Sequence, residues 1–336
     1  RPGDPDYLLG RSRETPHAYS DSTAAATSIH SGIKVFNGSV NIGTDYKQRT
    51  TIAHLAQRDY AMSVGAVTSV EISDATTAAA YAHNVSRDDY QDISRDFLGL
   101  RSISHRDEPL PGLDVLIGAG FGVNTKRDPS QGANFQPGNQ YIADADLERI
   151  SVEAGGKYRV VKRTSGRKGA ELLNEAVDQS LAEQSRLLGF FGTAYGHLPF
   201  QTANGDCIPV GVSPKRTEVY TRADIEENPT LEQMTSAAIR RLERNPNGFW
   251  LLVESGDIDR ANHANNLDDS IGSVLSGAKA FDEIVRWIEE RDAWDESLVI
   301  VTADHGHAFN LTQPQVIADA ATSEGSLPAA MIPVEQ

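Results

Sequence analysis

Short apolar runs along the chain alternate with longer stretches whose apolar residues recur every three to four positions. Each run has the length of a strand, and runs this apolar are typical of parallel strands that are buried on both faces. We predict strands at residues 61–68, 113–117, 158–161, 187–191, 249–253 and 298–302. Helical stretches separate them, and this alternation predicts a parallel sheet covered by helices on both faces.

The clearest helical stretch covers residues 266–290, where apolar residues from Leu267 to Ile288 recur at a period near 3.6. Two further helices are predicted at residues 171–186 and 231–244, and each leads into a strand. The fold class that follows is α/β, with a mostly parallel central sheet, helices on both faces and loop insertions.

Two stretches, at about residues 120–143 and 192–229, interrupt the alternation and are longer than ordinary loops. We interpret them as insertions over the rim of the sheet or as oligomer contacts, because neither has the composition of a linker between domains. A chain of 336 residues can bury one large core. The sequence therefore predicts a single domain over residues 1–336, decorated by two insertions.

The formal net charge is −16, which argues against a nucleic-acid partner because phosphate backbones are bound by an excess of Lys and Arg. An acidic, solvated surface explains the charge by itself. If the ligand is a small anion, bound divalent cations would supply the missing positive charge. The single cysteine, Cys207, excludes an intrachain disulfide and paired-cysteine zinc motifs. No apolar stretch approaches the length of a membrane span.

A hydroxyl nucleophile is suggested where Asp21 and Ser22 precede an Ala-rich run that ends at Gly32. Asp21 is placed to cap a helix whose first residue is Ser22, and glycine is a common C-cap. The free amides and the positive dipole at a helix N-terminus favour an anion, so a phosphate or a serine alkoxide would be stabilised there. An ordinary capping pair explains the same two residues without any chemistry.

Metal ligands are suggested beyond two later strands. Asp259 and His263 are four residues apart, so on a helical turn both face one ion, and a mixed carboxylate and imidazole pair suits zinc. Asp304 and His305 form a second such pair after the strand predicted at 298–302, and Glu254 directly follows the strand predicted at 249–253. Because the carboxyl ends of parallel strands gather at one edge of a sheet, we expect one site. Singly, each residue has a structural explanation as a cap or a solvated strand end, but together they indicate a metal-assisted hydrolase.

The segment 21–38 resembles the nucleophile segment of alkaline phosphatases. Segments 70–87, 113–120, 254–263 and 302–307 resemble further motifs of that family, in the family's order. The resemblance spans about residues 7–307. It implies an alkaline-phosphatase-like three-layer sandwich that hydrolyses small phosphate monoesters through a phosphoserine intermediate, with two zinc ions and one magnesium ion.

The resemblance also implies roles for individual residues. Ser22 would be the nucleophile, and Arg87 would hold two outer phosphate oxygens with its planar fork while Asp21 orients it. From local sequence alone, Arg87 could equally be a surface residue paired with Asp88 or Asp89.

For the metals, the resemblance assigns Asp259 and His263 to one zinc site and Asp304 and His305 to the other. It assigns Thr76 and Glu254 to magnesium, with Asp74 near the magnesium through water or a hydrogen bond. His307 would hydrogen-bond a ligand such as Asp259, or else be a core histidine.

Two ligands of the family have no evident equivalent. One is an Asp on a strand well upstream of the nucleophile, whereas Asp4 and Asp6 lie too close to Ser22 in a Pro/Gly-rich loop. The other is a His in a later segment. We therefore expect a chain truncated at both ends, with incomplete metal sites and weaker zinc binding than its parent. The family further implies a periplasmic or secreted protein and a possible homodimer.

Three alternatives stay open. A sulfatase would carry a Cys-x-Pro-x-Arg pattern, and residues 207–211 begin that way but have Gly in place of Arg. A phosphodiesterase of the same superfamily would attack with Thr, whereas Ser22 aligns with the nucleophile here. A noncatalytic fragment that binds phosphate or metal would keep the fold without turnover.

Overall fold

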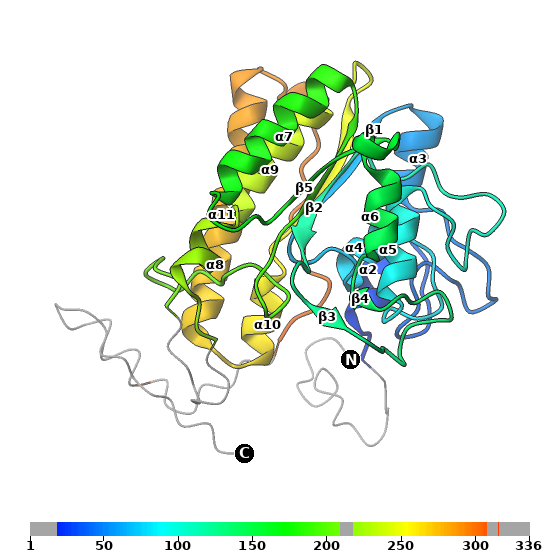
Figure 1. Ribbon diagram of the computed structural model, residues 1–336, viewed down its shortest axis with the longest axis horizontal. Helices are drawn as coiled ribbons and strands as arrows, with labels where there is room; N and C mark the ends of the chain where they lie inside the picture. The colour runs from blue at the N-terminus through cyan, green and yellow to red at the C-terminus, as the bar shows by residue number, and fades with distance from the viewer. Residues whose placement is uncertain (1–18, 209–217, 308–314, 316–336) are drawn as a thin grey trace.

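The computed structural model describes residues 19–208, 218–307 and 315, and Figure 1 shows the path of the chain. Five parallel strands form the central sheet in the order β5-β6-β2-β1-β7. Their bounds are β1 Ser63–Glu71, β2 Val115–Ala119, β5 Tyr158–Lys162, β6 Arg186–Phe190 and β7 Phe249–Glu254. Gly65 of β1 pairs with Val115 on one side and with Leu251 on the other. The predicted parallel α/β sheet is confirmed.

Five of the six predicted strands are present, and the prediction of a strand at residues 298–302 is wrong. This segment has no strand partner among the described residues, where the edge strand β7 pairs with β1 alone. Leu298, Ile300 and Val301 are 85%, 72% and 78% exposed. An apolar run forms a strand only where a neighbouring strand pairs with its backbone hydrogen-bonding groups. Hydrophobic periodicity along the sequence carries no information about that neighbour.

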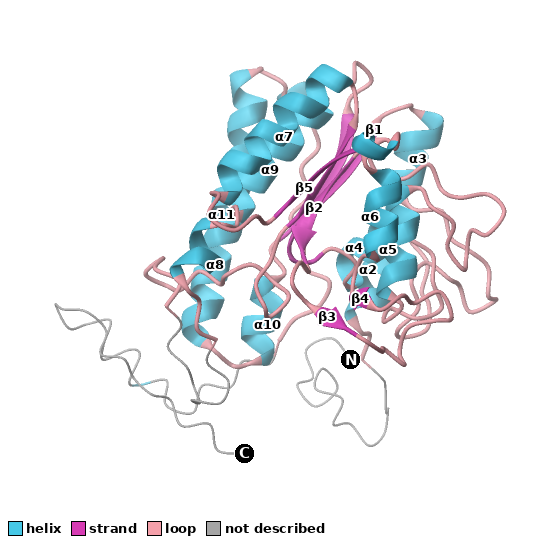
Figure 2. Cartoon of the chain, in the orientation of Figure 1, coloured by secondary structure: helices cyan, strands magenta, loops and turns pink. Residues whose placement is uncertain are grey.

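Helices cover both faces of the sheet, as Figures 1 and 2 show. One face carries α7 (Gly169–Glu183), α9 (Leu231–Leu242) and α11 (Leu267–Glu290). The other face carries α2 (Ser22–Ser31), α3 (Ile52–Asp59), α4 (Ala75–Tyr81), α5 (Tyr90–Leu98) and α6 (Asp144–Ile150). The short α10 (Asp257–His263) follows β7. The structure is therefore a three-layer sandwich.

The core has two apolar layers because the strands send alternate side chains to opposite faces. In β1, Val64 and Ala66 pack on the side of α3 to α6, whereas Val67 packs on the side of α7 and α9. Gly65 faces α9, and a Cβ there would lie 2.8 Å from Cδ1 of Leu242. The absence of a side chain at this position lets α9 lie close against the middle of the sheet.

The predicted helices form with small shifts at their ends. α11 begins after Asn266, whose side-chain oxygen accepts a hydrogen bond from the amide of Asp269. Gln184 is the C-cap of α7, and its φ of 56° gives it the left-handed conformation that commonly terminates a helix. α9 starts with a capping box between Thr230 and Gln233.

The first predicted insertion contains a short antiparallel pair, β3 (Asn124–Thr125) and β4 (Gly138–Asn139). The second contains α8 (Arg222–Glu226). The predictions about the missing Asp ligand and the sulfatase pattern involve Asp4, Asp6 and residues 209–211. These residues lie outside the described part of the chain. Among the helices that the structure describes, none combines the length and the apolar character needed to cross a bilayer.

Candidate active site

A pocket of about 710 Å³ lies where the chain leaves the carboxyl ends of β1 and β7. Open parallel sheets bind their ligands at this edge. The polar side chains that line the pocket include Ser22, Asp74, Arg87, Asp259, Arg260 and His263. Segments that are far apart in the sequence thus contribute to one surface, as the positions of the motifs predict.

Ser22 is the first residue of α2, and Asp21 is its N-cap, as predicted. Asp21 accepts hydrogen bonds from the amides of Ala24 and Gly38, both at 2.9 Å. These bonds fix the start of the helix, so the Ser22 side chain stands at its positive end. The Ser22 hydroxyl oxygen lies 3.1 Å from Nε2 of His305. The helix N-terminus therefore presents a hydroxyl group to the proposed metal ligands.

Arg87 lies between two carboxylates of the pocket. One terminal nitrogen donates to Asp21 at 3.3 Å and the other to Asp74 at 3.0 Å. Burial lowers the pKa of the guanidinium, but the charges of Asp74 and Asp21 outweigh it and leave the pKa raised. The alternative pairing with Asp88 or Asp89 does not occur among the described contacts. Arg87 is thus oriented toward the pocket by two acids, of which sequence reasoning anticipated Asp21.

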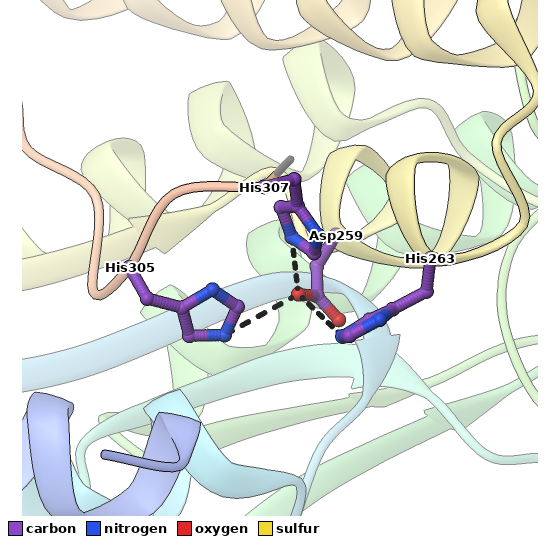
Figure 3. A group of neighbouring side chains, drawn as sticks. All are labelled: Asp259, His263, His305 and His307. Atoms are coloured by element: carbon purple, nitrogen blue, oxygen red, sulfur yellow. Dashed lines mark hydrogen bonds and ion pairs between the residues drawn. The ribbon is translucent and has the colours of Figure 1, made fainter. Parts of the chain in front are cut away.

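Three imidazoles surround one carboxylate oxygen of Asp259, as Figure 3 shows. Nε2 of His307 lies 3.0 Å from this oxygen, that of His263 lies 3.5 Å away and that of His305 lies 3.6 Å away. Asp259 and His263 come from one turn of α10, as their spacing predicts. A set of imidazoles and one carboxylate is the donor set that zinc prefers.

His305 has carboxylates on two sides. The resemblance places it with Asp304 in a different zinc site from Asp259, and its Nε2 lies 3.6 Å from both carboxylates. His305 therefore lies between the two predicted donor pairs, and the division of ligands into two zinc sites stays a prediction. Nε2 of His307 donates a hydrogen bond to the Asp259 carboxylate at 3.0 Å, and its role as a supporting residue stays a prediction. It is also close enough to the other imidazoles to be a ligand itself.

Glu254, at the end of β7, belongs to a second cluster of acids. Its carboxylate accepts a hydrogen bond of 2.7 Å from the Thr68 hydroxyl, and Thr76 is a further hydrogen-bond partner. Burial is the main cause that raises the pKa of Glu254 to about 7, and the nearby charges of Asp74 and Asp304 contribute to this increase. The Glu254 carboxylate and the Thr76 hydroxyl are hard oxygen donors of the kind that a divalent cation such as magnesium prefers. This cluster brings together Thr76 and Glu254, as the resemblance implies.

Sequence reasoning missed Arg260, which neighbours Asp259 in α10. Its guanidinium contacts the carboxylates of Glu71 and Asp74, so it adds a second cation beside Arg87. The available signal was its place next to a proposed ligand in a short helix. Sequence reasoning also missed His197, whose Nε2 lies 3.0 Å from a carboxylate oxygen of Glu218 in the pocket wall. His197 lies in the second predicted insertion, where residue spacing carries no information about contact.

The buried Glu254 predicts how the stability of the metal-free chain depends on pH. Its pKa is raised from 4.5 to about 7, so the folded state binds the extra proton between these values. The free energy of unfolding should therefore fall as the pH rises from about 4.5 to 7. Denaturant titrations should show a flatter dependence for Glu254→Gln. The exposed acid Glu148 is the control, and Glu148→Gln should behave like the parent. Equal pH dependence in Glu254→Gln and the parent would contradict the assignment.

The alkaline phosphatase family model matches residues 7–326. Alkaline phosphatase H of Pseudomonas aeruginosa is 30% identical over 94% of this chain and 63% of its own length. Alkaline phosphatase of Escherichia coli is also 30% identical, over 94% of this chain and 64% of its own length. The chain thus spans slightly less than two thirds of these relatives.

Solved structures share the fold. A cold-active alkaline phosphatase from Shewanella sp. has a TM-score of 0.56 at 23% identity, over 83% of this chain and 53% of that chain. A TAB5 alkaline phosphatase variant with Mg bound in its M3 site has a TM-score of 0.53 at 21% identity, over 81% of this chain and 61% of that chain. With the family match over nearly its whole length, the chain belongs to the alkaline phosphatase family.

Proposed function

We propose that the protein containing this chain hydrolyses phosphate monoesters to an alcohol and inorganic phosphate through a phosphoserine on Ser22. One observation carries the proposal: the Ser22 hydroxyl stands at a helix N-terminus, in a pocket that it shares with Arg87 and with the imidazole and carboxylate cluster. A helix N-terminus and an arginine fork favour a phosphoryl group, and an adjacent donor set favours metal activation of a hydroxyl.

The residues of the chain have separate tasks in this reaction. Arg87 binds two outer phosphate oxygens and sets the phosphorus in line with the Ser22 oxygen. The Ser22 oxygen forms a bond to phosphorus, the ester P–O bond breaks, and the alcohol leaves with a proton. Water then forms a new bond to phosphorus as the bond to Ser22 breaks, one proton of the water ends on the Ser22 oxygen, and inorganic phosphate results. Nε2 of His305 lies 3.1 Å from the Ser22 hydroxyl oxygen and positions this hydroxyl in the metal-free chain.

The metals in this proposal are two zinc ions and one magnesium ion. Asp259 and His263 would bind one zinc, Asp304 and His305 the other, and Thr76 and Glu254 the magnesium. When bound, such ions stabilise charge on the attacking and leaving oxygens and lower the pKa of a serine hydroxyl. Two features of this chain support the assignment. Donor atoms of Asp259, His263, His305 and His307 lie within 4.8 Å of one another, and Glu254 is a buried carboxyl beside the charges of Asp74 and Asp304.

The substrate class follows from where the cations are. Arg87 and Arg260 both line the pocket and would face the phosphate of a bound substrate. Most of the binding energy would then come from the phosphate, and the alcohol would matter little. We propose small phosphate monoesters in general. The test compares nitrophenyl phosphate, bis-nitrophenyl phosphate and nitrophenyl sulfate under zinc and magnesium. The monoester should have by far the highest kcat/KM, whereas a faster diester or sulfate would favour the phosphodiesterase or the sulfatase.

Replacing Arg87 with Lys should weaken phosphate binding more than it slows chemistry. A point charge replaces a planar fork held by two acids, so one of two parallel hydrogen bonds is lost. We expect KM for nitrophenyl phosphate and Ki for inorganic phosphate to rise by about 10-fold, which is ~1.4 kcal/mol. Steady-state kinetics check this, with Arg58→Lys as the control because Arg58 is an exposed residue of α3. Unchanged KM and Ki would remove Arg87 from the phosphate site.

The cellular setting of the protein is also a proposal. We infer a periplasmic or secreted location and a homodimer from the resemblance to the family, and we expect no nucleic-acid partner because of the charge of −16. Fractionation of cells and sedimentation analysis test these points. A noncatalytic role would show as phosphate and metal binding without turnover in the protein that contains this chain.

A further inference from the structure

A second group of potential metal ligands lies beside α5, and none of its members lines the pocket described above. His83 follows α4, Asp96 belongs to α5, and His105 lies in the loop after it. His83 and Asp96 are buried, and the His105 side chain is 10% exposed. One ligand atom of each residue lies within 4.8 Å of the other two. Nothing in the proposed phosphatase chemistry uses these residues.

The hydrogen bonds of His83 define which of its nitrogens carries the proton. Nε2 lies 2.8 Å from the backbone carbonyl oxygen of Arg49. A carbonyl oxygen only accepts, so Nε2 is the protonated nitrogen and neutral His83 has a lone pair on Nδ1. Burial lowers the pKa of His83 to about 3, which keeps the ring neutral. An imidazole that donates one N–H to a backbone carbonyl and turns its other nitrogen inward has the arrangement of a metal ligand.

The inward nitrogen of His83 faces a second imidazole. Nδ1 of His83 lies 3.0 Å from Nε2 of His105. Two imidazoles bound to one zinc ion at about 2.0–2.1 Å in a tetrahedral site have nitrogens about 3.3 Å apart. The observed spacing is thus close to that of two ligands of one ion.

Asp96 is the third member of the group, and one of its carboxylate oxygens is available to bind a cation. Its Oδ2 accepts the backbone amide of His83 at 2.9 Å and lies 3.9 Å from Nε2 of His105. Its Oδ1 is buried and has no well-formed hydrogen bond among the described residues. Burial raises the pKa of the Asp96 carboxyl to about 7, although hydrogen bonds from the His83 amide and the Ser102 hydroxyl lower it. A buried carboxylate without a full set of partners is costly, and a cation would offset that cost.

We propose that His83, Asp96 and His105 bind one divalent transition ion of the zinc type, at a site separate from the candidate active site. Two imidazoles and one carboxylate suit zinc and leave a fourth position for water. The partly exposed edge of His105 gives the ion a route from solvent. The neighbouring His54, which stacks on His83 at 5.2 Å, is not part of this group of ligand atoms. Its Nδ1 accepts the amide of Thr51, so the proton of the neutral ring is on Nε2, which then has no lone pair for an ion.

The ion would fix the loop that carries Arg87. His83 is four residues before Arg87, and the amide and carbonyl of Asn84 pair with Val40 in an isolated bridge. One ion would tie the end of α4, the middle of α5 and the loop after α5 together. An ion that binds the folded state and not the unfolded state raises stability by mass action. The site is therefore structural, and it acts on phosphate binding only by holding this loop.

The test uses a variant of the protein containing this chain in which the cluster at the candidate active site is removed. In this background Asp259, His263, His305 and His307 are replaced by Ala and Glu254 by Gln, so both proposed metal clusters of the candidate active site lose ligands while the second group stays intact. After chelator treatment, cobalt is titrated as a spectroscopic substitute for zinc. We expect one equivalent to bind with the visible absorption of a nitrogen-ligated ion. Zinc should raise Tm in the same background.

A matched variant adds His105→Gln to the same background, which removes one ligand at the partly exposed edge. We expect the cobalt absorption and the Tm increase to disappear, with affinity lower by at least ~10-fold. His54→Gln in the background should retain both signals. Two results would overturn the proposal: no bound equivalent in the background variant, or the same binding after His105→Gln. If His105→Gln does not fold, the titration of the background variant alone decides. One equivalent of cobalt with the absorption of a nitrogen-ligated ion supports the proposal, and its absence overturns it.

Discussion

Replacing Ser22 with Ala should lower kcat for nitrophenyl phosphate by at least ~10³-fold, because the attacking atom is removed. The rest of the site should persist. Asp21 still caps α2, Arg87 still lies between two acids, and the cluster around Asp259 contains no atom of Ser22. Zinc stoichiometry and the affinity for inorganic phosphate should therefore stay close to those of the parent. Steady-state kinetics, metal analysis and phosphate titration measure the three quantities.

The control for this variant comes from the same helix. Ser31 lies in the last turn of α2, and its hydroxyl donates to the carbonyl of Thr27. Ser31→Ala removes a hydroxyl of the same kind without touching the pocket, so kcat should remain within about twofold of the parent. A Ser22→Ala variant that keeps full turnover with zinc and magnesium would contradict the proposed mechanism.

The second large effect is expected for Asp259→Asn. The Asp259 carboxylate is the group that three imidazoles share, and an amide of the same shape has no charge to offer a cation. We expect the loss of at least one zinc equivalent and a decrease in kcat of ~10²-fold or more. Mutation of a residue that hydrogen-bonds a metal ligand typically lowers metal affinity or activity by roughly 10- to 100-fold, and removal of the ligand itself should cost more. Metal analysis after dialysis and steady-state kinetics check both parts.

An exposed acid provides the comparison for Asp259→Asn. Asp282 lies on the outer face of α11, so Asp282→Asn makes the same chemical change without touching the cluster. It should bind zinc and turn over substrate as the parent does. Normal zinc content in Asp259→Asn would show that the cluster in Figure 3 is not a metal site. Normal zinc content together with low turnover would instead give Asp259 a role in the chemistry alone.

Local patterns predict the parts of this protein that are local. The helix after Asp21 follows from a capping residue, an Ala-rich run and Gly32, and it places Ser22 as its first residue. α11 follows from a period of 3.6 over its whole length. The pair Asp259 and His263 also needs only one helical turn. In each case the interacting atoms are separated by a few residues, so spacing alone defines their geometry.

Contacts between distant segments were not predictable in the same way. Residues 298–302 have the apolar pattern of a strand, yet they are exposed because no described strand pairs with them. His197 and Glu218 meet across an insertion, and no periodic pattern connects them. The second group of potential metal ligands, His83, Asp96 and His105, joins α5 to two loops. In the sequence, each of these residues has the features of an ordinary polar residue. Only tertiary packing brings their nitrogen and oxygen atoms together.

The central claim is that Ser22 carries the phosphoryl group during turnover. The most direct measurement mixes the protein containing this chain with a phosphate monoester, quenches with acid, and analyses the peptide that contains Ser22 by mass spectrometry. We expect a phosphoryl group on Ser22 in the unsubstituted protein and none at this site in Ser22→Ala. Steady hydrolysis by the parent with no phosphoryl group on Ser22 at any time would contradict it.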